Sequence, residues 1–182
     1  MRTALQNTLA CLAVAGLLTA GCSNATRTTK PQLSSSPRAT ASAGPTPPAA
    51  ARAHSPAGAT AFARYWWGDM LNAAYRSLDT TQLKATSAAD CQTCQDYVST
   101  LESAKAEGRT YHSSSTVTDA EVVPTGTGQD TVVSVSFDQS AYQELDAHGK
   151  VIKSGAAQPN QAINLFLTWM GDHWVVKDVR SG

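Results

Sequence analysis

The chain has 182 residues, with 14 basic and 14 acidic side chains, so its formal net charge is zero. This length allows one ordinary domain but not two large ones, and a neutral balance gives no support for a nucleic-acid-binding protein. The neutrality is an average over two unlike parts. Six basic residues and no acidic residue precede Asp69, whereas eight basic residues and all 14 acidic residues lie from Asp69 onward.

The N-terminus has the pattern of an export signal. Arg2 precedes an uninterrupted apolar run over residues 9–18. A run of this length is too short to span a membrane, which takes about 20 residues, but it fits the apolar core of a secretory signal. We therefore predict a signal peptide over residues 1–21, which is removed from the mature protein.

The end of this signal resembles the lipobox of bacterial lipoproteins. The residues are Leu17-Leu18-Thr19-Ala20-Gly21-Cys22, in which Thr19 stands where the family usually has Leu. The resemblance implies cleavage between Gly21 and Cys22 and a diacylglyceryl group on the Cys22 thiol. It also implies a protein anchored by lipid on the extracytoplasmic face of the cell membrane, with the membrane as its partner. The alternative is a soluble secreted protein in which Cys22 is unmodified.

A linker follows over residues 22–57. Of residues 23–57, 26 of 35 are Ser, Thr, Pro or Ala, and Leu33 is the one large aliphatic side chain. Such a segment cannot bury enough apolar surface to offset its chain entropy, so we predict a disordered tether. The remaining residues, 58–182, are predicted to form a single domain of α+β class, with helices first and strands after them.

Three helices are predicted. The first covers residues 59–78, where the apolar side chains, Trp66 and Trp67 among them, fall on one half of the helical wheel. A short second helix covers residues 80–86. The third begins near Ser87 or Asp90, either of which can cap it, and ends before Gly108. Its apolar stripe contains Cys91, Cys94, Tyr97, Val98, Leu101 and Ala104.

The strands are predicted from alternating patterns. Residues 116–123 and 131–137 are joined through a turn at 126–128, and alternation places Val133, Val135 and Phe137 on one side of the second strand. Residues 142–153 form a hairpin around 146–149. In the last hairpin, Gly171-Asp172 is the two-residue turn. This turn sets Trp169 opposite Trp174, and Leu165 opposite Asp178. Asp178 then shares the apolar face, where it either ends the strand in solvent or lies in a cavity.

Several features together resemble the uncharacterised actinobacterial lipoproteins of domain of unknown function 6318. The features are the lipobox, the linker, Phe62-Ala-Arg-Tyr65-Trp66 opening the long helix, the Cys91-Gln-Thr-Cys94 motif and the final Trp-rich hairpin. More broadly, the chain is similar to the nuclear-transport-factor-2-like, SnoaL-like superfamily. That resemblance implies helices packed on a curved antiparallel sheet, which forms a cone with a pocket. The candidate pocket residues are Trp66, Trp169, Trp174 and Asp178, although core packing is the commoner role for a helical Trp.

The cysteines offer one candidate for chemistry. Cys91 and Cys94 lie in an oxidising compartment, which favours a structural disulfide, and a thioredoxin-like redox pair is the alternative. A zinc site needs two further ligands that the spacing does not supply. Isolated acid–base groups such as His112, Asp119, Asp146, His148 and Asp178 form no catalytic pair, so we predict no catalytic residues and no cofactor.

The sequence thus favours a lipid-anchored binding domain that is not an enzyme. It would take a protein partner or a small apolar ligand in the cone, and no nucleic acid. Two alternatives stay open. One is a SnoaL-like pocket enzyme that uses Asp178 or Asp119, and the other is a thiol–disulfide redox protein that uses Cys91 and Cys94.

Overall fold

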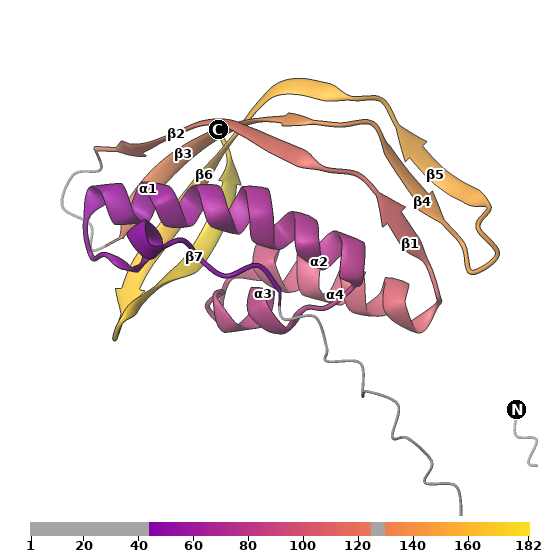
Figure 1. Ribbon diagram of the computed structural model, residues 1–182, viewed down its shortest axis with the longest axis horizontal. Helices are drawn as coiled ribbons and strands as arrows, with labels where there is room; N and C mark the ends of the chain where they lie inside the picture. The colour runs from indigo at the N-terminus through magenta and orange to yellow at the C-terminus, as the bar shows by residue number, and fades with distance from the viewer. Residues whose placement is uncertain (1–43, 125–129) are drawn as a thin grey trace, which may run out of the picture. The chain divides into compact units, whose positions relative to one another are not determined.

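The computed structural model describes residues 44–124 and 130–182 (Figure 1). The predicted signal peptide, the cleavage site between Gly21 and Cys22, and the predicted turn at 126–128 lie outside the described residues. Among the helices of the described residues, none is long and apolar enough to cross a membrane.

The first predicted helix is present and begins earlier than expected. Ser55 caps it by accepting a hydrogen bond from the Gly58 amide, and Pro56 occupies the first turn, where a missing N–H costs nothing. The helix runs without interruption through three segments and ends at Leu78, which adopts a left-handed conformation with φ of 54°. The segments are α1 (Pro56–Arg64), the π-helical η2 (Tyr65–Met70) and α2 (Leu71–Ser77).

The predicted disorder is wrong for residues 44–57. They contain the 3₁₀-helix η1 (Ala49–Arg52), and Ala51 is buried in the core. The Ala53 carbonyl accepts a 3.0 Å hydrogen bond from the indole nitrogen of Trp174. The Pro45 carbonyl accepts one of 2.6 Å from the Tyr65 hydroxyl. Composition misses this segment because backbone carbonyls, rather than large apolar side chains, fix it to the domain.

The second and third predicted helices are confirmed as α3 (Thr81–Ala85) and α4 (Gln92–Ala106), but the expected caps of α4 are wrong. Cys91 caps α4, because its sulfur accepts from the Cys94 amide at 3.3 Å. Ser87 instead forms a parallel bridge with Val176, and a turn closed by the hydrogen bond from the Cys91 amide to the Ala88 carbonyl leads into the helix. Gly108 follows α4 with φ of 67°, as expected of a residue just beyond a helix end.

The strands form two antiparallel sheets, which confirms the α+β class. The large sheet has the order β2-β3-β6-β7, and the small sheet has the order β1-β4-β5. The chain passes directly from β1 to β2, from β3 to β4 and from β5 to β6, so the two sheets adjoin along three strand pairs (Figure 1). The bounds are β1 (Thr110–His112), β2 (Ser115–Val123), β3 (Thr131–Gln139), β4 (Tyr142–Leu145), β5 (Val151–Gly155), β6 (Gln158–Met170) and β7 (His173–Ser181).

The core lies between the large sheet and the helices. The predicted inner face of β3 is confirmed, since Val133, Val135 and Phe137 are all buried. They belong to one cluster with Leu165 and Leu167 of β6 and with the aromatic side chains of the first helix. Alternation along the strands therefore predicted correctly which residues the helices cover.

The last hairpin is confirmed at its turn and corrected at its far end. Trp169 pairs with Trp174 as predicted, but the register shifts between Phe166 and Leu167. Val179 therefore pairs with Leu165 on the core face, and Asp178 pairs with Phe166 on the other face. The extra residue, Lys177, forms a β-bulge in β7. Alternation does not reveal a bulge, because one inserted residue moves every following side chain to the opposite face of the sheet.

Candidate functional site

A cavity of about 770 Å³ lies between α2, α4 and the small sheet. Five aromatic side chains, each from a different element, line it: Trp67, Tyr75, Tyr97, Tyr111 and Tyr142. In Figure 1 the small sheet stands apart from α2 and α4, which is the region where this cavity lies. A volume of this size is typical of small-molecule sites, which range over about 300–1,000 Å³.

The π-helical segment η2 supplies Trp67. Its wider turn is closed by a hydrogen bond from the Leu71 amide to the Trp66 carbonyl. Trp66 is fully buried in the core, whereas the neighbouring Trp67 ring borders the cavity. The Trp67 ring is fixed by Phe137 at 4.8 Å and by an edge contact with Tyr97 at 6.3 Å between ring centres.

Gly155 positions Tyr142. The two residues pair directly between β5 and β4. A Cβ atom at position 155 would lie 2.2 Å from the Tyr142 ring, so the ring occupies the space that the glycine leaves free. Tyrosine packed over a glycine on the neighbouring strand is a recognised way to protect such a position.

Tyr75, Tyr97 and Tyr111 stay protonated at neutral pH, because the pKa of each is raised. Burial, followed by the charges of Tyr97 and Tyr111, raises the pKa of Tyr75 to about 12. Burial also raises the pKa of Tyr97. Tyr75 and Tyr111 pack edge to face at 5.3 Å. The phenol groups therefore present neutral hydroxyls, which can both donate and accept hydrogen bonds.

One ion pair lies on the cavity wall. Nη1 of Arg109 donates to Glu144, whose side chain is nearly buried, and Nε of Arg109 lies 3.1 Å from Glu107. The hydrogen bond with Glu144 is the main reason that the pKa of Arg109 is raised, and the charge of Glu107 adds to it. Two carboxylates thus compensate the guanidinium. Lys153, the other basic residue of the wall, lies with Nζ 6.0 Å from the centre of the Tyr142 ring.

Hydroxyl and amide groups complete the wall where the two sheets meet. The Gln139 side chain accepts from Ser115 Oγ at 2.8 Å and donates to Ser113 Oγ at 2.5 Å. Asn72 of α2 accepts from the Ser115 amide at 2.9 Å. These contacts hold the polar wall in one arrangement, so a ligand would not need to order it.

None of the four predicted pocket residues lines this cavity. Trp66 and Trp174 are buried in the core. Trp169 stacks on His54 with ring centres 4.8 Å apart, at the hairpin end. Asp178 lies on the other face of β7, where it accepts from the Val179 amide and from Nε of Arg180. Sequence reasoning missed the tyrosines because five separate elements bring the aromatic side chains together.

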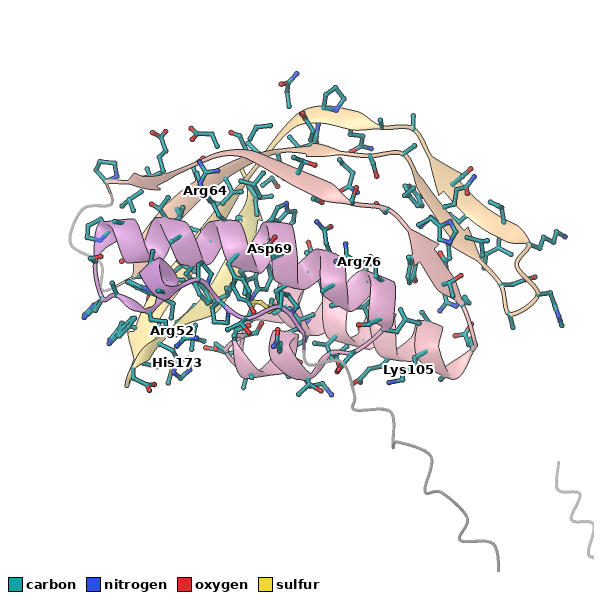
Figure 2. All side chains as sticks on the ribbon, in the orientation of Figure 1. Arg52, Arg64, Asp69, Arg76, Lys105 and His173 are labelled. Atoms are coloured by element: carbon teal, nitrogen blue, oxygen red, sulfur yellow. A yellow bond between two sulfur atoms is a disulfide. The ribbon has the colours of Figure 1, made fainter. Side chains whose placement is uncertain are left out.

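The remaining acid–base candidates do not gather either. Asp119 of β2 is 68% exposed and pairs at 3.1 Å with Arg64, which Figure 2 shows on the first helix. Asp146 accepts from the amides of His148 and Lys150 in the turn of the β4–β5 hairpin, which confirms that hairpin. Neither Asp119 nor Asp178 lines the cavity, so the structure gives no support to an enzyme that uses them there.

Cys91 and Cys94 form a disulfide, as predicted, with Cα atoms 5.3 Å apart. Both residues are buried, at 1% and 0% exposure. Thiol exchange needs a sulfur that a reductant can reach, so this burial favours a structural role over the redox alternative.

A family model described as "Family of unknown function (DUF6318)" matches residues 33–180. The chain belongs to the DUF6318 family. The match spans both sheets and all the helices described above, so the cavity lies within the DUF6318 region. No curated protein matches the chain.

Two solved structures are similar to this DUF6318 chain at low identity. One is the intermembrane space region of the chloroplast protein ARC6, with a TM-score of 0.46 and 11% identity over 64% of this chain and 89% of the other. The second is Aln2 from a Streptomyces species, with a TM-score of 0.33 and 14% identity over 57% of this chain and 79% of the other.

Proposed function

We propose that this protein is a lipid-anchored binding protein on the extracytoplasmic face of the cell membrane, and that its ligand occupies the cavity between α2, α4 and the small sheet. The observation that carries the binding role is the cavity itself, a space of about 770 Å³ walled by five aromatic side chains. Large aromatic walls with a few fixed polar groups are typical of ligand sites.

The composition of the wall favours binding over catalysis. The residues that line it include one carboxylate, Glu144, and no histidine or cysteine. General acid–base catalysis needs a group that can exchange a proton near neutral pH. Glu144 is held by Arg109, and the tyrosine protons are retained, so this wall is suited to contact a ligand rather than to react with it.

The anchor follows from the lipobox-like segment that ends at Cys22. A lipid on Cys22 would attach the domain to the membrane through the Ser-, Thr- and Ala-rich segment before residue 44. The three basic residues before residue 44, Arg27, Lys30 and Arg38, would lie near the anionic surface, and the acidic domain would be held away from it. We also propose membership of the nuclear-transport-factor-2-like, SnoaL-like superfamily, because helices precede an antiparallel sheet that passes into a second sheet along three strand pairs.

The binding role is tested with a fluorescent dye. We expect the uncharged aromatic dye Nile red to bind the protein and to gain fluorescence, because its flat aromatic rings fit the tyrosine-lined wall. Thr100 lies on α4 at the cavity wall, so Thr100→Trp should fill part of the space and lower dye affinity by on the order of tenfold.

The matched control is Ala106→Trp, which adds the same side chain to the exposed end of α4 outside the cavity. It should leave the dye affinity unchanged. Equal affinity of the Thr100→Trp variant and the original protein, or no dye binding at all, would contradict a binding site at this cavity. The anchor has its own test: mass spectrometry of the native protein should find a diacylglyceryl group on Cys22, and an unmodified thiol would refute it.

A further inference from the structure

We infer that the ligand of this cavity is a neutral carbohydrate, bound with its ring faces against the tyrosines and its hydroxyls against the polar wall. This inference rests on the proposed binding function and names the chemical class of its ligand. Three features of the wall carry it: compensated charge, flat aromatic surfaces and a fixed set of uncharged hydrogen-bonding groups.

The charges on the wall favour neither an anion nor a cation. Arg109 is paired with Glu144 and lies 3.1 Å from Glu107, so its charge is already compensated. Lys153 is exposed and lies over the Tyr142 ring. A charged ligand that bound either group would have to compete with the partner already in place, and loss of Arg109 would leave Glu144, which is 7% exposed, without its counter-charge.

The aromatic walls favour a ligand with apolar faces. Tyr75 and Tyr97 come from the helices, and Tyr111 and Tyr142 come from the opposite sheet. A sugar ring presents C–H groups on its faces, and tyrosine rings cover such surfaces at little cost in conformational entropy. Rings on both sides of the cavity therefore suit a flat, ring-shaped ligand.

The hydrogen-bonding groups favour a ligand rich in hydroxyls. Ser113, Ser115 and Gln139 form one connected set on the wall, and each side-chain oxygen has a further lone pair available. Within the described residues, the hydroxyls of Tyr75 and Tyr97 make no hydrogen bond to another residue, and the buried phenols keep their protons.

A purely apolar ligand, which the sequence suggested, fits this wall less well. It would cover hydroxyl and amide groups without replacing their hydrogen bonds to water, which is unfavourable. A sugar hydroxyl is both donor and acceptor, so it can satisfy a serine, a tyrosine or an amide in turn. The combination of covered ring faces and paired hydroxyls selects a carbohydrate over both an apolar and a charged ligand.

The test uses the full chain and calorimetry with three neutral trisaccharides: maltotriose, cellotriose and N,N′,N″-triacetylchitotriose. We expect at least one of them to bind with an affinity that is the same in about 50 mM and about 500 mM salt, since no net charge is involved. Tyr142→Ala should lower this affinity by about tenfold, and Tyr142→Phe by less, because the ring is kept. The control is Ile152→Ala on β5, which is exposed and does not line the cavity.

The outcomes separate this inference from the proposed function. Suppose that Thr100→Trp weakens dye binding but none of the three sugars binds at millimolar concentration. The carbohydrate inference is then wrong, and the proposed binding site stands. Tighter binding of the anionic trigalacturonate than of the neutral sugars also overturns the carbohydrate inference as stated. If neither the dye nor any sugar binds, both proposals fail. Sugar binding that Tyr142→Ala and Ile152→Ala weaken equally would place the sugar elsewhere and overturn the inference.

Discussion

The large sheet and the small sheet are built from the same run of chain, yet they meet the helices differently. In the large sheet, Val133, Val135, Leu165, Leu167 and Val176 all have 0% exposure beneath the helices. In the small sheet, Glu144 is the one buried side chain among β1, β4 and β5. Helices α2 and α4 face it across the cavity, and Tyr75 of α2 touches Tyr111 of β1 edge to face at 5.3 Å.

This difference separates the source of stability from the candidate site. Burial of the large sheet supplies the hydrophobic free energy, and it fixes three strands that continue into the small sheet. Those strands carry Tyr111 and Tyr142 to one side of the cavity, while the helices carry Tyr75 and Tyr97 to the other. The packed large sheet thus holds the small sheet and its part of the cavity wall in place, as a preorganised site requires.

The largest expected effect contrasts one apolar residue from each sheet. Leu167→Ala removes a fully buried side chain of the large sheet and should lower the free energy of unfolding by about 2–5 kcal/mol. Ile152→Ala removes a side chain of the small sheet that is 50% exposed and should change it by less than about 0.5 kcal/mol. Urea unfolding of the two variants measures both values. Similar losses would show that the small sheet also belongs to the core.

A second prediction concerns the disulfide, which lies on the side of the large sheet. The hydroxyl of Thr93, between the two cysteines, donates to the Val179 carbonyl of β7. Replacing Cys91 and Cys94 with alanine should lower the free energy of unfolding by about 2 kcal/mol, because the unfolded chain loses a cross-link and α4 loses its N-terminal cap. Urea unfolding measures the loss, and dye affinity at a temperature where both proteins are folded should stay the same. A fall in dye affinity without a loss of stability would instead tie the disulfide to the cavity.

The sequence predicted the structure correctly where a single element holds the whole signal. Alternation predicted the buried face of β3, and Gly171 predicted the turn between β6 and β7. It failed at Asp178, because the bulge that moves this carboxylate off the core face depends on the neighbouring strand. Local composition likewise hid the ordered segment near Ala53, which is held by the distant Trp174.

The cavity could not be predicted for a related reason. Four different elements carry the tyrosines of the cavity, Tyr75, Tyr97, Tyr111 and Tyr142. Within its own element, each tyrosine has the pattern of an ordinary half-buried residue. Gly155 gives the clearest local signal, since a glycine inside a strand indicates a close approach. That signal does not identify Tyr142 as the group that approaches, because the pairing of β4 with β5 decides it.

The third prediction tests burial in the cavity through pH. The folded protein raises the pKa of Tyr75 from 10.0 to about 12, so it holds this proton more tightly than the unfolded chain does. The stabilisation is therefore complete below pH about 10 and is lost as the pH rises towards 12. Between pH 9 and pH 11, the raised pKa of Tyr75 should lower the free energy of unfolding by about 1.4 kcal/mol.

Urea unfolding at these two pH values checks this expectation, with Tyr75→Phe as the comparison. The variant lacks the titrating hydroxyl, so its stability should fall less over the same interval. An equal fall in the variant and the original protein would mean that Tyr75 is as well solvated as an unfolded tyrosine, and the small sheet would then be more open than the structure shows.

The smallest expected effect concerns the connection between the helices and the large sheet. Ser87 bridges to Val176, yet its buried hydroxyl has no hydrogen-bond partner among the described residues. Ser87→Ala removes this unpaired group and should raise the free energy of unfolding by up to about 1 kcal/mol. Thr86→Val is the matched contrast, because the Thr86 hydroxyl donates to the Gln82 carbonyl at 2.8 Å and its loss should cost about 1 kcal/mol. Opposite signs for adjacent residues would show that the large sheet tolerates an unpaired polar group only at a cost. Equal losses would mean that a bound water satisfies Ser87, so that this edge of the core is hydrated.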